Sequence, residues 1–422
     1  MESDVRIKVK YMKIIIYPSF ERQFYNLKSH QRTYLLYGRI HDDFTVCHFT
    51  GFNLSKNEYP IGFLTISNTP VEKSIITAKA IEYPYLHVYV KEDLSILRAD
   101  IFHNIDIIDS NIQVEIEYLN LSRLFVRIDQ KETPIKVLNG KKVAIIGLGS
   151  GGALLALYLA KSGVKELIFI DNDRLETHNI IRHICDLADL GRFKTKAVQD
   201  YIEARIPDMR IKTVEKKFNL HTKADFDFYF NILHEVDLIA AVSGEHDVNY
   251  EINDFIHSNQ LKIPVLYAGT FDGVKGGLMF RVDPKQDDYC YHCIYSEPGM
   301  NGSIESQAIP TMVELEQQIS YDRTLQEELA QPGLGLDIDN LTVLLAKFCL
   351  DVLLTEIKHG LYQFPHNFYM WFNRTIMTKD NSSVKFEGLE LYYYEDLGKD
   401  KNCPFHGTQM INKQNQEKES KK

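Results

Sequence analysis

The sequence has few cysteines, no excess of positive charge and no long apolar run. Six cysteines in 422 residues are too few for a disulfide-held scaffold. Lys and Arg number 48 against 58 Asp and Glu, so the net charge is −10, which argues against nucleic acid as a partner. No stretch reaches the ~18 apolar residues that a membrane span needs, and the start MESDVRIKVKYMK does not resemble a secretory leader. We therefore expect a soluble cytoplasmic enzyme without a membrane partner.

The first 120 residues predict an α+β unit that serves as an accessory domain, with no cluster of catalytic side chains. Phe20, Phe24 and Leu27 recur at helical spacing. The turn His41-Asp42-Asp43 separates two strand patterns. The expected helix covers 19–30, and the expected strands cover 12–17, 33–40, 44–50, 61–66, 86–90 and 113–118.

From residue 121 to about 410 the pattern alternates between strand and helix, as in a doubly wound α/β domain. Residues 411–422 are almost wholly polar, and we expect a disordered tail. A hairpin is expected over 272–282 and a polar crossing over 296–335. The other expected strands are 142–146, 166–170, 236–242 and 264–268. One expected helix follows the strand 142–146 and ends at Gly163, and the other expected helices cover 194–205, 247–257 and 341–354.

A glycine-rich turn follows the first strand of this domain. The run Val143-Ala-Ile-Ile-Gly-Leu-Gly-Ser-Gly-Gly fits the dinucleotide fingerprint. Glycines let backbone N–H groups approach a phosphate at a helix N-terminus, although such a turn can also be purely structural. Asp171 ends the next strand and suits a ribose hydroxyl pair, so a nucleotide site is favoured. The glycines concerned are Gly147, Gly149, Gly151 and Gly152.

The residues after Asp171 favour a nucleotide that is cleaved. A nicotinamide enzyme needs no cations here, whereas cleavage of a triphosphate needs fixed positive charge. Arg182 and Lys194 would supply that charge, Asn179 would bind phosphate oxygens, and Asp173 would orient a metal or the ribose. Each residue alone fits an ordinary solvated loop, but the combination favours phosphate chemistry.

With these motifs in order, residues 121 to 406 resemble the superfamily of ThiF, MoeB and the microcin-adenylating enzyme MccB, which is related to the ubiquitin-activating enzymes. The resemblance implies ATP-dependent adenylation of a carboxylate by a homodimer. It also implies Mg²⁺ bound by an acidic residue after the strand 236–242, where Glu245 replaces the usual aspartate. An arginine before the nucleotide domain would reach the partner's site; Arg123 is the best match and Arg127 the second. By the resemblance, Gly147, Gly149, Gly151 and Gly152 bind ATP, Asp171 binds the ribose, and Asp173, Asn179, Arg182 and Lys194 form the phosphate-binding and catalytic set.

Two ligand pairs far apart in the sequence predict a structural zinc site. A Cys-x-x-Cys pair and a Cys-x-x-His pair have the composition of a closed tetrahedral Zn²⁺ site. Relatives often have two Cys-x-x-Cys pairs, so the histidine is a departure. The alternative is a metal-free thiol pair beside an unrelated histidine. We expect His292, inside the first pair, to be exposed and idle. The predicted ligands are Cys290, Cys293, Cys403 and His406.

The remaining cysteines argue against a thioester step on this chain. Related enzymes that form a thioester place a cysteine in the crossing segment, and none lies between Cys293 and Cys349. Cys349 falls in an apolar run and is expected in the core. Cys185, close behind Arg182, is expected to be a small packed residue.

The first 120 residues resemble, more distantly, a JAB-type isopeptidase domain. Such domains bind zinc through a His-x-His-Pro motif, and the nearest equivalent here is Ser67-Asn-Thr-Pro70, without histidines. If the resemblance holds, the domain has lost its metal and only recognises a partner. The alternative is an unrelated accessory domain.

The favoured function is Mg²⁺- and ATP-dependent adenylation of the C-terminal carboxylate of a small ubiquitin-like protein or peptide, with release of pyrophosphate. One alternative is an NAD(P)- or FAD-dependent oxidoreductase, which uses the same turn and Asp171. Another is a catalytically silent nucleotide-binding scaffold, for which Glu245 is an argument. The sequence does not identify the acceptor or its pathway.

Overall fold

The chain divides into two compact units, Met1–Leu124 and Phe125–Lys422, each with its own hydrophobic core. The expected JAB-like Ser67–Pro70 segment, most of the 296–335 crossing and the 411–422 tail lie outside the described residues. The computed structural model describes residues 11–25, 33–41, 45–51, 59–66, 85–91, 93, 95–103, 106–109, 112–286, 289–295, 333–356, 363–377, 383–394, 399–400 and 402–407.

In the first unit, an eight-stranded mixed sheet has the order β7-β6-β5-β4-β2-β3-β1-β8. Phe20 and Phe24 are buried on helix α1, Pro18–Tyr25, and belong to the same core as β1 and β3. The six expected strands are present, whereas β6 and β7 were not expected. The strands are β1 Tyr11–Ile16, β2 Thr33–Ile40, β3 Val46–Gly51, β4 Tyr59–Ile66, β5 Tyr85–Val90, β6 Ile96–His103, β7 Asp106–Asp109 and β8 Gln113–Tyr118.

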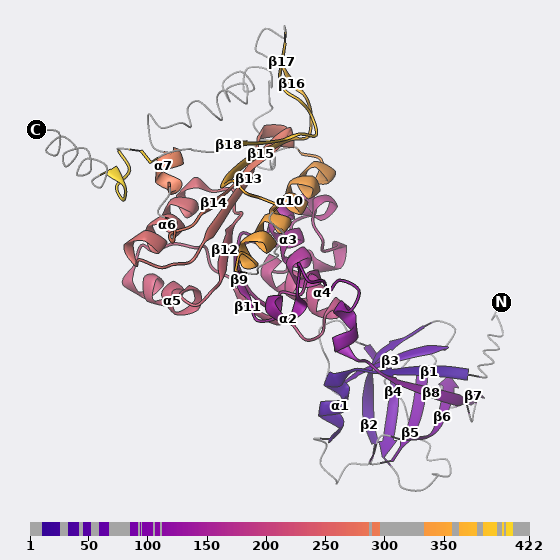
Figure 1. The fold of residues 1–422 in the computed structure, drawn as a ribbon. Helices are drawn as coiled ribbons and strands as arrows, with labels where there is room; N and C mark the ends of the chain where they lie inside the picture. The colour runs from indigo at the N-terminus through magenta and orange to yellow at the C-terminus, as the bar shows by residue number, and fades with distance from the viewer. Residues whose placement is uncertain are drawn as a thin grey trace, which may run out of the picture. The chain divides into compact units, whose positions relative to one another are not determined.

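The second unit has an eight-stranded sheet in the order β11-β10-β9-β12-β13-β14-β15-β18 (Figure 1). The first five strands are parallel and the last three antiparallel, which confirms the doubly wound, Rossmann-like prediction. The strands are β9 Lys142–Ile146, β10 Glu166–Ile170, β11 Arg210–Val214, β12 Leu238–Ala241, β13 Val265–Thr270, β14 Gly276–Val282, β15 Phe368–Phe372 and β18 Leu391–Tyr394, and β16 Ile376–Met377 pairs separately with β17 Val384–Phe386.

One prediction about this sheet was wrong. The segment 272–282 is not a self-contained hairpin, because only its second part is a strand. Asp272–Val274 forms the 3₁₀ turn η4, and β14 pairs with the preceding strand β13. The η4 turn therefore connects β13 and β14, so the hairpin begins one strand earlier than expected.

Helices cover both faces of the second sheet (Figure 1). Alternate strand residues point to opposite faces, so Val143 packs on one side and Ala144 on the other. In the part of the chain that is described, no helix is both long and apolar enough to span a bilayer. One face packs against α2 Ile135–Leu138, α3 Ser150–Lys161, α4 Lys194–Arg205 and α10 Gly335–Leu353, and the other against α5 Lys223–Leu233, α6 His246–Ser258 and α7 Tyr291–Tyr295.

The order of the strands fixes where a ligand can bind. Strand β9 lies between β10 and β12, so the order of the strands reverses at β9, which is the switch point of the sheet. In open parallel sheets, ligands bind outside the carboxyl ends of the strands at this switch point. The segments that follow β9, β10 and β12 begin at Gly147, Asp171 and Val242, and they carry most of the predicted site residues.

Candidate nucleotide site and metal cluster

The turn after β9 depends on glycine at two positions. Gly147 has a φ of +98°, and a Cβ there would lie 2.6 Å from the backbone of Ser243. At Gly152 a Cβ would lie 2.0 Å from the carbonyl oxygen of Gly147. Gly149 is the N-cap of α3, and a Cβ added there meets nothing within 4 Å. The turn is therefore packed tightly underneath and open where the N-terminus of α3 presents its N–H groups.

Asp171 holds this turn from the end of β10. Its Oδ2 accepts the N–H of Leu148 at 2.6 Å, and its Oδ1 accepts the N–H of Asp173 at 2.7 Å. Burial raises the pKa of Asp171, although both backbone bonds and Lys194 favour the charged form. The carboxylate thus lies beside the glycine turn and orients its backbone, while the predicted role of Asp171 as ribose ligand remains a prediction.

Lys194 begins α4 and pairs with Asp173. Its Nζ lies 2.8 Å from Oδ2 of Asp173, and its N–H donates to the carbonyl of Asp173 at 3.0 Å. Lys194 is 8% exposed, whereas the Asp173 side chain is 59% exposed. The two contacts with Asp173 hold the nearly buried Lys194 side chain in place. Lys194 also acts electrostatically on Asp171 and His183.

Asn179 and Arg182 share the 3₁₀ helix η2, Thr177–Arg182. The Oδ1 of Asn179 accepts the N–H of Glu176 at 3.0 Å, so the side chain would meet a ligand with its Nδ2 group, which is a donor. Arg182 packs beside the N-terminus of α10, because a Cβ added at Gly335 would lie 3.7 Å from its Cα. That Asn179 and Arg182 share a site with Lys194 remains a prediction.

His183, directly after Arg182, is a site residue that the sequence reasoning missed. Its Nε2 lies 3.0 Å from the carbonyl oxygen of Leu148 in the glycine turn, and its Nδ1 lies 3.2 Å from the N–H of Cys185. Burial lowers the pKa of His183, with Lys194 adding to the effect. No local motif marks this residue, because its partner is 35 positions away.

Glu245 follows β12 and is the N-cap of α6. Its carboxylate pairs with Lys217, a second residue that the sequence reasoning missed. Both side chains are about half exposed. The pair raises the pKa of Lys217, and Asp247 and Asp173 act in the same direction. Three carboxylates therefore favour the charged form of one ammonium group, and Glu245 is the one in direct contact with it.

The other cations near the turn have structural partners. Arg174 stacks 3.8 Å above the ring of Phe193, and Arg192 pairs with Asp189 and Asp200. Arg123 lies exposed in the 3₁₀ helix η1, Leu121–Phe125, at the end of the first unit. Its predicted role in a partner subunit remains a prediction.

The four predicted metal ligands come together in the structure. The ligand atoms of Cys290, Cys293, Cys403 and His406 all lie within 4.8 Å of one another, and all four residues are buried. The Sγ atoms of Cys290 and Cys403 are 3.5 Å apart, and Nδ1 of His406 is 3.2 Å from Sγ of Cys293. Ligands at ~2.3 Å and ~2.0 Å from a tetrahedral zinc would be separated by similar distances. Three thiols and an imidazole nitrogen thus fit Zn²⁺.

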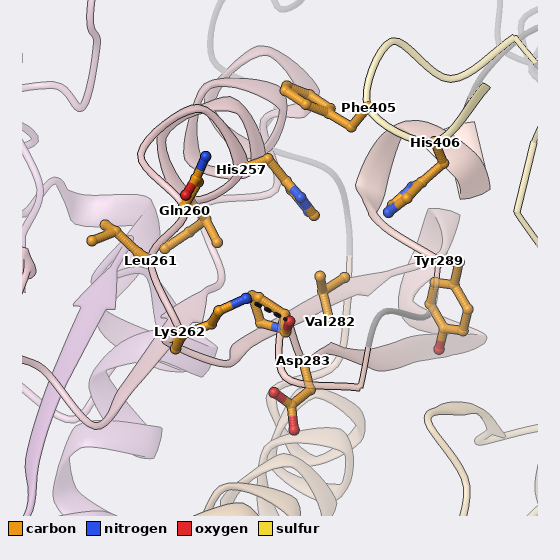
Figure 2. A pocket seen from close by; sticks show the side chains of 11 residues that line it. His257, Gln260, Leu261, Lys262, Val282, Asp283, Tyr289, Phe405 and His406 are labelled. Carbon is orange, nitrogen blue, oxygen red and sulfur yellow. Dashed lines mark hydrogen bonds between the residues drawn. The ribbon is translucent and has the colours of Figure 1, made fainter. Parts of the chain in front are cut away.

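The prediction for His292 was wrong. Its side chain is 22% exposed, and Nε2 lies 2.8 Å from Oδ1 of Asp254. It therefore helps join α7 to α6 beside the metal cluster. His406 also lines a pocket, together with Phe405 and the end of α6 (Figure 2). In this pocket Lys262 donates to the carbonyl of Pro284 at 3.3 Å.

All six cysteines of the chain are buried. Cys185 and Cys349, which lies on α10, belong to the core on the α3 side of the sheet, as predicted. Burial raises the pKa of the Cys185 thiol to about 12 and also raises that of Cys349. Cys47 lies in the core of the first unit. Neither Cys185 nor Cys349 is a thiolate near neutral pH.

Comparisons with known proteins agree with this architecture. The model of the ThiF family matches residues 119–383. The chain is 27% identical over 206 residues to the adenylyltransferase and sulfurtransferase UBA4 of Candida albicans, covering 47% of this chain and 43% of that protein. It is 26% identical over 174 residues to the SAMP-activating enzyme E1 of Haloferax volcanii, covering 40% and 58% respectively. The chain thus spans about half the length of these curated relatives.

Among solved structures, the chain is similar to E. coli MccB crystallised with AMPCPP and MccA, with a TM-score of 0.44 and 16% identity over 64% of this chain and 68% of that one. The family match covers more than half of the chain, including the glycine turn, Asp171, Lys194 and the first pair of cysteines. The chain therefore belongs to the ThiF family, as the order of its motifs predicted.

Proposed function

We propose that this chain uses ATP and Mg²⁺ to adenylate the C-terminal carboxylate of a small ubiquitin-like protein or peptide. The observation that carries the proposal is the buried ammonium of Lys194, held by Asp173 beside the glycine turn. A fixed cation at the carboxyl edge of a Rossmann-like sheet suits a reaction in which phosphate charge builds up. The relatives named above are activating enzymes and adenylyltransferases, which supports the same reaction class.

In the proposed reaction, a carboxylate oxygen of the acceptor attacks the α-phosphorus of ATP. The bond from that phosphorus to the oxygen bridging the α- and β-phosphates breaks, and pyrophosphate leaves with the electron pair. The product is an acyl-adenylate. The N–H groups of the glycine turn would hold the phosphates, and Lys194 and Arg182 would neutralise the charge on the leaving group. Asp171 would bind the ribose, and Asn179 would donate to a phosphate oxygen.

The carboxylates at the edge of the sheet fit a magnesium ion. Glu245 pairs with the ammonium of Lys217, and Asp247 and Asp173 also attract it electrostatically, so this location favours a cation. Carboxylate oxygens are preferred ligands of Mg²⁺, which would reduce the charge of the pyrophosphate that leaves. Glu245 would be its main protein ligand. Because the ion pair with Lys217 is exposed, it is weak and can be exchanged.

We propose further that no thioester forms on this chain. Three cysteines belong to the metal cluster, and Cys47, Cys185 and Cys349 are buried. Because burial raises the thiol pKa of Cys185 and Cys349, neither would be a competent nucleophile without a rearrangement. The acyl-adenylate would be passed directly to the next acceptor.

The metal cluster has a structural role in this proposal. Zn²⁺ on Cys290, Cys293, Cys403 and His406 would have no open position and would fasten the segment 402–407 to α7.

We also propose that the enzyme is a homodimer in which Arg123 serves the partner's site, and that the first unit recognises the acceptor.

The test is ATP–pyrophosphate exchange by the purified chain with Mg²⁺, using small proteins with C-terminal Gly-Gly from the same source as acceptors. Exchange that depends on one acceptor would establish adenylation. ATP binding without exchange would favour a silent scaffold, and binding of NAD in preference to ATP would favour an oxidoreductase.

A further inference from the structure

The imidazole of His183 bridges two backbone groups that are far apart in the sequence. The N–H of Cys185 donates to Nδ1, so Nδ1 carries no proton. The neutral ring then carries its proton on Nε2 and donates it to the carbonyl oxygen of Leu148 at 3.0 Å. This tautomer follows from the hydrogen-bond network. His183 therefore joins the segment that carries Arg182 to the glycine turn.

Leu148 is held on both sides by these contacts. Its N–H donates to Asp171 at 2.6 Å, and its carbonyl accepts from His183. Its side chain is fully buried, so the residue cannot turn without disturbing the core. The bond from His183 thus fixes the peptide between Leu148 and Gly149. Because the N–H and C=O of a trans peptide point in opposite directions, it also fixes the direction of the Gly149 N–H.

Gly149 borders open space, because a Cβ built on it meets nothing within 4 Å. It is also the N-cap of α3, so its N–H is one of the first N–H groups of that helix. The first N–H groups of a helix need partners from outside the helix, and phosphate oxygens are suitable ones. A donor whose direction is fixed in advance binds a ligand without a further loss of conformational freedom.

We propose that His183 is a positioning residue for ATP, whose Nε2–H fixes the Leu148–Gly149 peptide and couples the glycine turn to the segment of Arg182. This inference rests on the proposed function, in which the glycine turn binds the phosphates of ATP. His183 itself touches no reacting atom. Its effect is expected on nucleotide binding and not on binding of the acceptor.

Two variants distinguish the hydrogen bond to the Leu148 carbonyl from the local hydrogen bond with the Cys185 N–H. In His183→Asn, the short side chain can still accept the N–H of residue 185 as an Asx turn but cannot reach Leu148. In His183→Gln, the amide can reach the Leu148 carbonyl as a donor. We expect His183→Asn to weaken ATP binding about tenfold and His183→Gln to bind ATP nearly as the wild type does. The KM for the acceptor should not change in either variant.

Equal ATP affinity of His183→Asn and the wild type, or an equal loss in both variants, would overturn the inference. Equilibrium binding of ATP is the readout, so the inference is tested even if no acceptor supports pyrophosphate exchange. A second measurement needs no variant to fold. ¹⁵N NMR of labelled histidine should show that His183 of the wild type carries its proton on Nε2 alone, and a proton on Nδ1 would overturn the proposal.

Discussion

Lys194 and Asp173 are joined twice, by an ion pair of 2.8 Å and by a backbone hydrogen bond of 3.0 Å. The Lys194 side chain is 10% exposed, whereas the side chain of Asp173 is 59% exposed. An anionic ligand can therefore approach the ion pair only from the solvent side, where Asp173 is exposed. This arrangement fixes one positive charge at the N-terminus of α4, where the helix dipole adds to its attraction for phosphate.

Lys194→Ala should abolish measurable pyrophosphate exchange, with a rate lower by about 10²-fold or more, because the cation that stabilises the leaving phosphates is lost. The matched control is Lys165→Ala. Lys165 also pairs with an aspartate, Asp208, at 2.8 Å, but precedes β10 at the opposite end of the strand from Asp171. The control should keep full exchange. If both variants exchanged at the wild-type rate, Lys194 would have no catalytic role.

Lys217→Met should lower the Mg²⁺ concentration that gives half-maximal exchange by several-fold. Its ammonium pairs with Glu245 and so competes with the metal for that carboxylate. The neighbouring Lys216 pairs with Asp225, so Lys216→Met is the control that should leave the Mg²⁺ requirement unchanged. A higher Mg²⁺ requirement in Lys217→Met would mean that the lysine helps to bind phosphate and does not compete with the metal.

The centre of the second sheet could be predicted from the sequence because it consists of short buried apolar runs. Lys142–Ile146 and Glu166–Ile170 have the expected bounds, and the helix at Lys194 begins where it was expected. Edge strand β11, Arg210–Val214, was missed because only its last residue is buried, and a half-exposed strand lacks a strong pattern.

The two missed site residues have a different explanation. His183 acts on the carbonyl of Leu148, and Lys217 acts on a carboxylate 28 positions away. Neither contact follows from local spacing, since each depends on how separate loops meet at the edge of the sheet. The Cys290 and Cys403 pairs could be predicted despite a separation of 113 residues, because the ligand chemistry of each pair is itself the signal.

Cys403→Ala should reduce bound zinc from about one ion per chain to none, because a closed tetrahedral site does not retain the metal with three ligands of lower total charge. The thermal midpoint should fall as well, since Cys403 and His406 hold the 402–407 segment in the buried cluster. Cys47→Ala is the control, as Cys47 is equally buried but lies in the first unit. Zinc is measured by elemental analysis of the dialysed protein. A metal-free wild type would show that the cluster is a set of reduced thiols.

The last prediction concerns pH and His183. Burial, with Lys194 adding to it, lowers the pKa of His183, while the Leu148 carbonyl and Asp189 act in the opposite direction. The folded pKa is thus below the value of about 6.5 in the unfolded chain. The stabilisation from the neutral ring is fully present above about 6.5 and is lost as the pH falls through the folded pKa, because the unfolded chain then binds the proton more readily. Urea unfolding of the wild type and His183→Gln should therefore show a difference in stability that shrinks on acidification. A difference that grew on acidification would mean that the ring is charged in the folded protein.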